Sequence, residues 1–281
     1  MTASKGGWEL PISERELSSL TREMTAAHEE TLPVMRAAGL ELAEEIRSRG
    51  GERPAHPGRR GFLLGAGGAA AALALAACSS GGKSGAAGAP SAPGGAGAGV
   101  TGAAAMASGS ASGQYTGDLQ LVALATALEN QAVGAYQATL DAAKAGKLGT
   151  VPPAVANFVT TAMAQHADHA KAWNAVLTGA GKPAITGVPL SNQAQVTSAL
   201  AAATDVTTVA KLALQLEDQA AQTYLVATYS VTSPGGIATA ATIAPVEAMH
   251  AAILNYVLGQ YPVPDAFLPT DKAASPSLLT V

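Results

Sequence analysis

Six side chains of the kinds that bind metal ions recur at helical spacing after Cys78. Beyond that residue the sequence contains only three glutamates and three histidines, arranged as Glu129, His166-x-x-His169, Glu217 and Glu247-x-x-His250. Residues three apart lie on one face of an α-helix, so both members of each x-x-His pair can contact the same metal cluster. Carboxylates and imidazoles on facing helices build such clusters, and the pattern therefore predicts a two-metal site inside a four-helix bundle.

The three glutamates fall within the apolar stripes of their helices. The face of Glu129 also carries Val122, Ala125, Ala132 and Val133, and the other two glutamates repeat this arrangement. An unpaired carboxylate is costly to desolvate in such a place. No arginine follows Arg60, and no lysine stands three, four or seven residues from any of the six side chains. Since no base on the same helix face can pair with these carboxylates, a metal ion is the best remaining cation.

The region also repeats internally. Residues 128–136, LENQAVGAY, align with residues 216–224, LEDQAAQTY, and HADH at 166–169 aligns with EAMH at 247–250. Two helix pairs related by a pseudo-twofold axis would bring all these motifs to one place in the bundle core. Tyr136 and Tyr224, each about two turns after its glutamate, are expected to pack behind the ligands with satisfied hydroxyls rather than to take part in redox chemistry.

With these motifs, residues 117–262 resemble the ferritin-like superfamily, the carboxylate-bridged metal proteins that include rubrerythrins and bacterioferritins. The resemblance implies an all-α fold, an antiparallel four-helix bundle with a crossover connection, and two iron or manganese ions without an organic cofactor. It also implies the ligand roles, in which Glu129 and Glu217 are the single glutamates, Glu247 and His250 form a complete Glu-x-x-His, and His169 is the second histidine.

His166 departs from the family pattern, because it stands where the family has its fourth carboxylate. A neutral imidazole is a good terminal ligand but does not hold two cations together as a bridging carboxylate does. The site is therefore expected to hold two ions asymmetrically, one ion only, or a metal other than iron. Asp168 lies off the face of His166 and His169 and is expected on the surface.

The helices that position these residues are expected at 117–145, 153–179, 192–203, 206–231 and 236–260. Glycines or prolines separate all of them except the third and the fourth. The connection from 181 to 204 is the predicted crossover, which allows two helix pairs to lie in parallel. The proline-containing segment 263–281 is expected to be an extended tail over the surface.

A second group of motifs precedes the bundle. Residues 58–78 read GRRGFLLGAGGAAAALALAAC, with a twin arginine at Arg59 and Arg60, an uncharged apolar run, and the only cysteine of the chain, Cys78. The run is short for a membrane span, which needs about 20 apolar residues, and it is typical of a signal-peptide core at 58–77. It resembles the signal of the twin-arginine export route, and LAAC resembles a bacterial lipobox.

These resemblances imply export by the twin-arginine machinery, lipidation of Cys78, and a place at the outer face of the cytoplasmic membrane as a lipoprotein. The alternatives are an ordinary thiol after an apolar run and an uncleaved anchor helix. Residues 78–116 begin with the lipid-anchor cysteine and continue, to about Ser112, with almost entirely Gly, Ala, Ser and Pro; they are expected to be a flexible tether.

Residues 1–57 are rich in Glu and Arg and are expected to form a charged cytoplasmic leader, shortened if translation starts at Met35. An amphipathic helix is expected at about 17–46, broken near Pro33 and Gly39. His28 is assigned to a solvated face of that helix, and cleavage before Cys78 would remove it from the mature protein.

Other function classes find little support. No glycine-rich phosphate loop follows a strand, no nucleophile stands in a recognisable elbow, and the acidic balance after Cys78 argues against nucleic acid. Two hypotheses remain. The first is a redox metalloprotein that reacts with oxygen, peroxide or ferrous ion, and the second is a non-catalytic bundle that holds a metal or binds a partner. Both are compatible with a homodimer.

Overall fold

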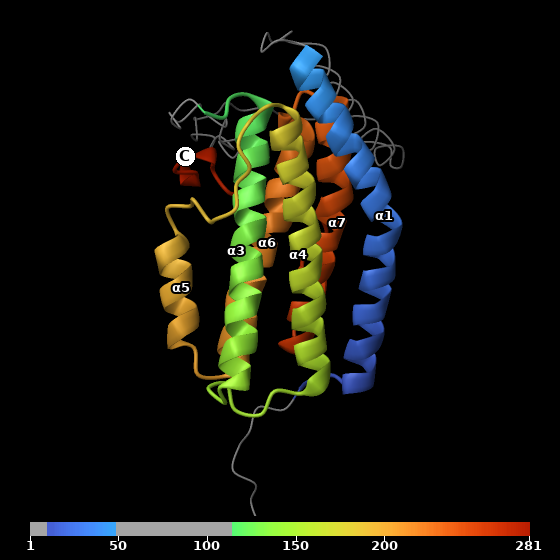
Figure 1. Cartoon of the computed structure of the whole chain (residues 1–281). Helices are drawn as coiled ribbons and strands as arrows, with labels where there is room; N and C mark the ends of the chain where they lie inside the picture. Colours follow the sequence, from blue (N-terminus) through green and yellow to red (C-terminus); the bar gives the residue numbers. More distant parts are fainter. Residues whose placement is uncertain (1–9, 49–113) are drawn as a thin grey trace, which may run out of the picture. The chain divides into compact units, whose positions relative to one another are not determined.

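Long α-helices make up most of the structure, a computed structural model that describes residues 10–48 and 114–281 (Figure 1). The helices are α1 (Glu14–Ser48), α3 (Asp118–Lys144), α4 (Pro153–Gly179), α5 (Gln193–Ala202), α6 (Val206–Ser230) and α7 (Pro234–Val257), with a short 3-10 helix η1 (Pro276–Leu278). No β-strand forms among these residues, which contain one isolated bridge between Leu190 and Leu279. All of them belong to one compact unit of the chain.

Four helices form the predicted bundle. α3 and α4 make one antiparallel pair, α6 and α7 make the other, and the long connection from α4 to α6 contains α5, which packs beside α3 (Figure 1). The start of α3 lies at the start of α7, where the carboxylate of Asp118 accepts hydrogen bonds from the backbone N–H groups of Thr232 and Ser233, both at 3.1 Å. These bonds satisfy donors just before α7 begins. The all-α bundle with a crossover connection is confirmed, and the expected helix bounds differ from the observed ones by at most three residues.

A fifth long helix, α1, packs along α4 and α7 (Figure 1). Its buried side chains recur at three- and four-residue intervals, and they include Leu17, Thr21, Met24, His28, Met35, Ala38 and Leu42. The first turn of α1 also contacts the ends of two other helices. The carboxylate of Glu14 accepts from the backbone N–H of Ala154 at 3.3 Å, and that of Glu16 accepts from the Tyr256 hydroxyl at 3.1 Å. α1 is therefore part of the same folded unit as the bundle.

The expected break in this helix near Pro33 and Gly39 is wrong, because α1 continues through both residues. Pro33 has no N–H group to donate to the backbone carbonyl of Glu29, four residues earlier. Both residues are exposed, so this carbonyl can be hydrated. Gly39 is buried against α4, where a Cβ atom would lie 3.2 Å from Cγ2 of Val176. Glycine weakens an isolated helix, but at position 39 it allows α1 and α4 to approach closely.

Replacing Gly235 of α7 by alanine is expected to loosen the packing of α1. The new Cβ would lie 2.5 Å from the carbonyl oxygen of Ala38 and 2.7 Å from the amide nitrogen of Leu42, both backbone atoms of α1. Overpacking of this kind costs about 1–3 kcal/mol. Hydrogen exchange should therefore become faster in α1 of the full chain. The matched control is Gly134→Ala, where nothing lies within 4 Å; it should be neutral or stabilising by up to about 1 kcal/mol. Unchanged exchange in α1 of Gly235→Ala would contradict the packing described.

The core consists of two apolar clusters with a polar layer between them. One cluster contains Leu124, Trp173 and Ile243, and the other contains Phe158 and Leu254, together with many smaller residues. Of the described helices, only α7 has the length and hydropathy that would suit a bilayer, and half of that stretch is buried within the bundle. Its apolar character is that of a core helix that also supplies residues to the polar layer.

The last segment, 258–281, returns along the bundle, and its backbone N–H groups donate hydrogen bonds to side chains of α6. The N–H of Lys272 donates to Oε1 of Gln222 at 2.7 Å, and the N–H of Ala274 donates to the Thr223 hydroxyl at 2.8 Å. The predictions for the twin arginine (Arg59, Arg60), the apolar run, Cys78 and most of the tether concern residues outside those that the structure describes.

Candidate metal centre

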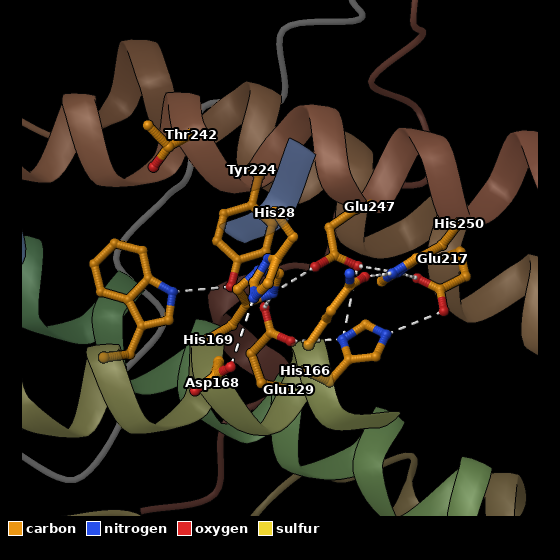
Figure 2. A network of polar contacts seen from close by, with 12 residues as sticks. His28, Glu129, His166, Asp168, His169, Glu217, Tyr224, Thr242, Glu247 and His250 are labelled. Atoms are coloured by element: carbon orange, nitrogen blue, oxygen red, sulfur yellow. Dashed lines mark hydrogen bonds and ion pairs between the residues drawn. The ribbon is translucent and has the colours of Figure 1, made fainter. Parts of the chain in front are cut away.

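All six side chains singled out by the sequence meet in the polar layer between the two apolar clusters (Figure 2). They come from four helices, with Glu129 on α3, the two histidines on α4, Glu217 on α6, and Glu247 with His250 on α7. Each is at most 1% exposed. The 3.6-residue period of each helix turns these residues inward, and the crossover brings the two halves of the repeat face to face.

The six residues form two groups of four that share His166 and Glu247. Glu129 and His169 complete the first group, and Glu217 and His250 complete the second. Within each group, one donor atom from every residue lies within 4.8 Å of the others. Nδ1 of His166 lies 2.7 Å from Oε2 of Glu129, whereas its Nε2 lies 3.1 Å from Oε1 of Glu217. The two ring nitrogens of His166 are thus turned toward different groups.

Glu247 is the carboxylate shared by both groups. Its Oε1 lies 2.8 Å from Nδ1 of His169, and its Oε2 lies 3.4 Å from Nδ1 of His250. Both oxygens are buried, yet neither makes a hydrogen bond of ordinary geometry with the described residues. A buried carboxylate without well-aligned donors is costly, and a cation between the groups would satisfy it. The donor set of carboxylates and imidazoles therefore fits a metal ion, and iron and manganese are among the metals that such ligands suit.

Two tyrosines connect the halves of the repeat. The Tyr136 hydroxyl donates to Glu217, and the Tyr224 hydroxyl donates to Glu129, so each half holds the glutamate of the other. Nε1 of Trp173 donates in turn to the Tyr224 hydroxyl at 2.9 Å. Burial, together with the neighbouring carboxylates, raises the pKa of both tyrosines well above the usual value. Their hydroxyls therefore stay protonated and fix the orientation of the two carboxylates.

His28 of α1 belongs to the edge of this site, and its assignment to a solvated face is wrong. The side chain is 4% exposed, and its ring packs edge-on against that of His169 with centroids 5.1 Å apart. Nε2 of His28 lies 3.6 Å from Oδ2 of Asp168. Asp168 itself is partly exposed and accepts a hydrogen bond from Arg36 at 2.9 Å. The ring of His28 is buried by the packing of α1 against α4, which the sequence neighbours of His28 do not indicate.

Gln165 and Trp173 also contribute to the site, although the sequence reasoning missed both. Oε1 of Gln165 lies 2.7 Å from Nε2 of His250, on the side of the ring opposite the carboxylates. Gln165 precedes His169 by four residues and Trp173 follows it by four, so all three share one face of α4. That spacing was the signal that could have identified them.

The combined attraction between the histidines and glutamates of the cluster has a larger effect on their pKa values than burial has. Burial alone would lower the pKa of His169 and raise that of Glu129. The two groups attract each other, and the pKa of His169 is raised to about 9 while that of Glu129 is lowered to about 2. Burial likewise opposes a charge on His166, but Glu247 and Glu217 raise its pKa well above the usual value. Without metal, the site is a buried network of imidazolium and carboxylate groups.

The metal-free chain is expected to be most stable near pH 6.5. The pKa of His169 rises from 6.5 to about 9 on folding, so its contribution is complete below pH 6.5 and is lost as the pH rises through 9. Burial, together with His169, lowers the pKa of His28 from 6.5 to about 4, so stability falls as the pH falls over that range. Glu129 adds a loss as the pH falls from 4.5 toward 2. Thermal unfolding in a chelating buffer measures the profile, and a midpoint that rises from pH 6.5 to 9 would contradict it.

Comparison with known proteins agrees with this geometry. The family model described as a ferritin-like domain matches residues 112–260, more than half of the 281-residue chain. The matched range contains helices α3 to α7 and all six clustered side chains, and it excludes α1. No curated protein and no solved structure matches the chain.

Proposed function

The chain belongs to the ferritin-like domain family, and on that premise we propose that its buried cluster is a di-metal redox site that binds iron or manganese and acts on oxygen, peroxide or ferrous iron. The observation that carries the proposal is the pair of four-residue donor groups that share His166 and Glu247. The carboxylate of Glu247 is buried between them without a hydrogen-bond donor of ordinary geometry in the described structure. A donor set built around a shared carboxylate suits two cations.

In this proposal the place of each residue in the two donor groups decides which metal ion it would bind. Glu129 and His169 would hold one metal and Glu217 and His250 the other, while His166 and Glu247 are available to both. When bound, iron or manganese supplies Lewis acidity and one-electron chemistry. The hydrogen bonds from Tyr136 and Tyr224 hold the glutamates in orientation. The apolar clusters on either side keep bulk water away, which strengthens electrostatic interactions inside the site.

We further propose that the protein is exported by the twin-arginine route and held at the outer face of the cytoplasmic membrane by a lipid on Cys78. The motifs at Arg59, Arg60 and Cys78 support this placement. Because that route carries folded proteins, the metal would be loaded in the cytoplasm. Replacing both arginines by lysine should leave the unprocessed chain inside the cell, and mass spectrometry of the mature N-terminus should show a lipidated Cys78. A mature protein that retains residues 1–77 would refute the lipid anchor.

A second candidate function, a non-catalytic scaffold, is favoured by the position of His166. Its imidazole lies between the carboxylates of Glu129 and Glu217, with one ring nitrogen facing each. Since those carboxylates and Glu247 keep its pKa well above the usual value, the protonated ring is itself a cation inside the cluster. A bundle neutralised in this way needs fewer metal ions, or none.

Elemental mass spectrometry separates the two candidates. The full chain is purified, reconstituted with ferrous iron or with manganous ion, desalted, and assayed for metal per chain. Two equivalents are expected, together with turnover of ferrous iron or peroxide. One equivalent would indicate a mononuclear site, and none would favour the scaffold. Asp141→Asn is the matched control, because it removes an exposed carboxylate of α3 and should leave the metal content unchanged.

A further inference from the structure

An apolar cavity of about 40 Å³ lies between α3, α4, α6 and α7, beside the polar layer. Its walls are valine, leucine, alanine and phenylalanine side chains apart from Tyr136 and Thr139, and they include Val155, Ala210 and Leu254. The two hydroxyls in the wall are already engaged, since Tyr136 donates to Glu217 and Thr139 donates to the carbonyl of Ala135. No side chain of the wall is left to donate a hydrogen bond to a guest in the cavity.

This lining selects what the cavity can hold. A water molecule needs about 10–15 Å³ and two to four polar partners. The volume would admit about three waters, but the walls offer them almost no hydrogen bonds. Apolar cavities of this kind stay dry and bind small non-polar molecules or xenon. The space is too small for a large organic substrate, so the ligand class that fits is a non-polar molecule of a few atoms.

Two aromatic rings of the cavity wall contact histidines of the metal centre. The ring of Tyr136 stacks on His166 with centroids 5.7 Å apart, and the ring of Phe158 meets His250 edge-on at 6.4 Å. A second space of about 10 Å³ shares Tyr136, Thr139 and Ala213 with the cavity, and it is also lined by Glu217. A molecule held in the cavity is therefore separated by one layer of wall side chains from residues of the second donor group.

We propose that this cavity binds a small non-polar molecule of the size of dioxygen and delivers it to the metal centre past Tyr136 and Phe158. The delivery role rests on the proposed function, because it needs a metal that reacts with oxygen. Binding does not rest on it, because the apolar walls are formed by the chain alone. An apolar store beside a buried redox site would raise the local concentration of a gas that dissolves poorly in water.

Xenon NMR of the full chain, without added metal, tests the binding. Wild type should show one saturable xenon site. Ala210→Leu adds carbon atoms inside the cavity and should weaken xenon binding at least tenfold, whereas Val155→Ala enlarges the space and should strengthen it. Ala241→Leu makes the same change as the first variant at an exposed position of α7 and should behave as wild type. Absence of xenon binding in wild type, or equal binding in all variants, would overturn the proposal.

Stopped-flow kinetics of the iron-loaded chain tests the delivery. Ala210→Leu should slow the reaction with dissolved oxygen several-fold and leave the reaction with hydrogen peroxide, a polar molecule, unchanged. Equal slowing of both reactions would overturn delivery through the cavity. A chain that takes up no iron would overturn the proposed function and the delivery with it, while the xenon result would still decide whether the cavity binds an apolar molecule.

Discussion

Replacing Glu247 by glutamine is expected to abolish binding of both proposed metal ions. Its carboxylate is the only one present in both donor groups, and its two oxygens face His169 and His250. Removing a residue that only hydrogen-bonds to a metal ligand already weakens metal binding about 10–100-fold. Removing a ligand that both groups share should therefore weaken metal binding by at least about 100-fold. Metal per chain, measured after reconstitution, should fall from two to near zero. Circular dichroism should show that the helices remain.

The matched controls are Glu129→Gln and Glu217→Gln, because each removes a carboxylate from one group only. Each variant should retain about one metal ion per chain. If Glu247→Gln also retained one ion, the carboxylate would not be shared and the two groups would act separately. If all three variants kept both ions, the metal would be bound elsewhere.

Replacing His166 by glutamate is expected to make the stability of the bundle depend on metal. The change removes the imidazole between Glu129 and Glu217 and adds a fourth buried carboxylate, as in the family pattern. Breaking a buried charge pair costs about 3–5 kcal/mol, which corresponds to a fall in Tm of roughly 6–20 °C for a domain of this size. Bound metal stabilises the folded state by mass action. Differential scanning calorimetry with and without manganous ion should show a low metal-free Tm and a larger rise on adding metal than in wild type.

The control for this variant is His166→Gln, which also removes the imidazole but adds no carboxylate. It should lower the metal-free Tm without enlarging the response to metal. An equal metal response in the two variants would show that a fourth carboxylate does nothing for the site, and that His166 is no substitute for one.

The bundle and the cluster could be predicted because their signals are local. Each inward glutamate stands in an apolar stripe without an arginine or lysine on the same helix face, and a three-residue spacing places His166 with His169 on one face. The repeat then indicates which helices must face each other. The sequence also indicates that the tyrosines lie behind the ligands. It does not indicate that each tyrosine donates its hydrogen bond to the glutamate of the other half. Tyr136 holds Glu217 rather than the glutamate of its own helix, which depends on how α3 and α6 are placed in space.

The role of α1 could not be read in the same way. Its charged outer face and its position before a signal-like segment favoured a leader, and Pro33 and Gly39 favoured a broken helix. Helix propensity describes an isolated segment, whereas the close contact of Gly39 with Val176 stabilises α1 only when α4 is present. The same limit applies to His28, which is buried by the packing of α1 and not by its own sequence neighbours.

α1 packs on α4 and α7, and the chain that connects α1 to the bundle sets the local concentration of α1 at this packing face. While residues 49–113 join α1 to the bundle, α1 meets its binding face at an effective concentration set by the length of that connection. If Cys78 is lipidated as proposed, the chain is cut just before that residue, and the same cut would make α1 a separate molecule. α1 would then stay on the bundle only where its concentration exceeds its Kd. Processing at one peptide bond would thus convert a permanent helix of the fold into a dissociable partner that covers His169.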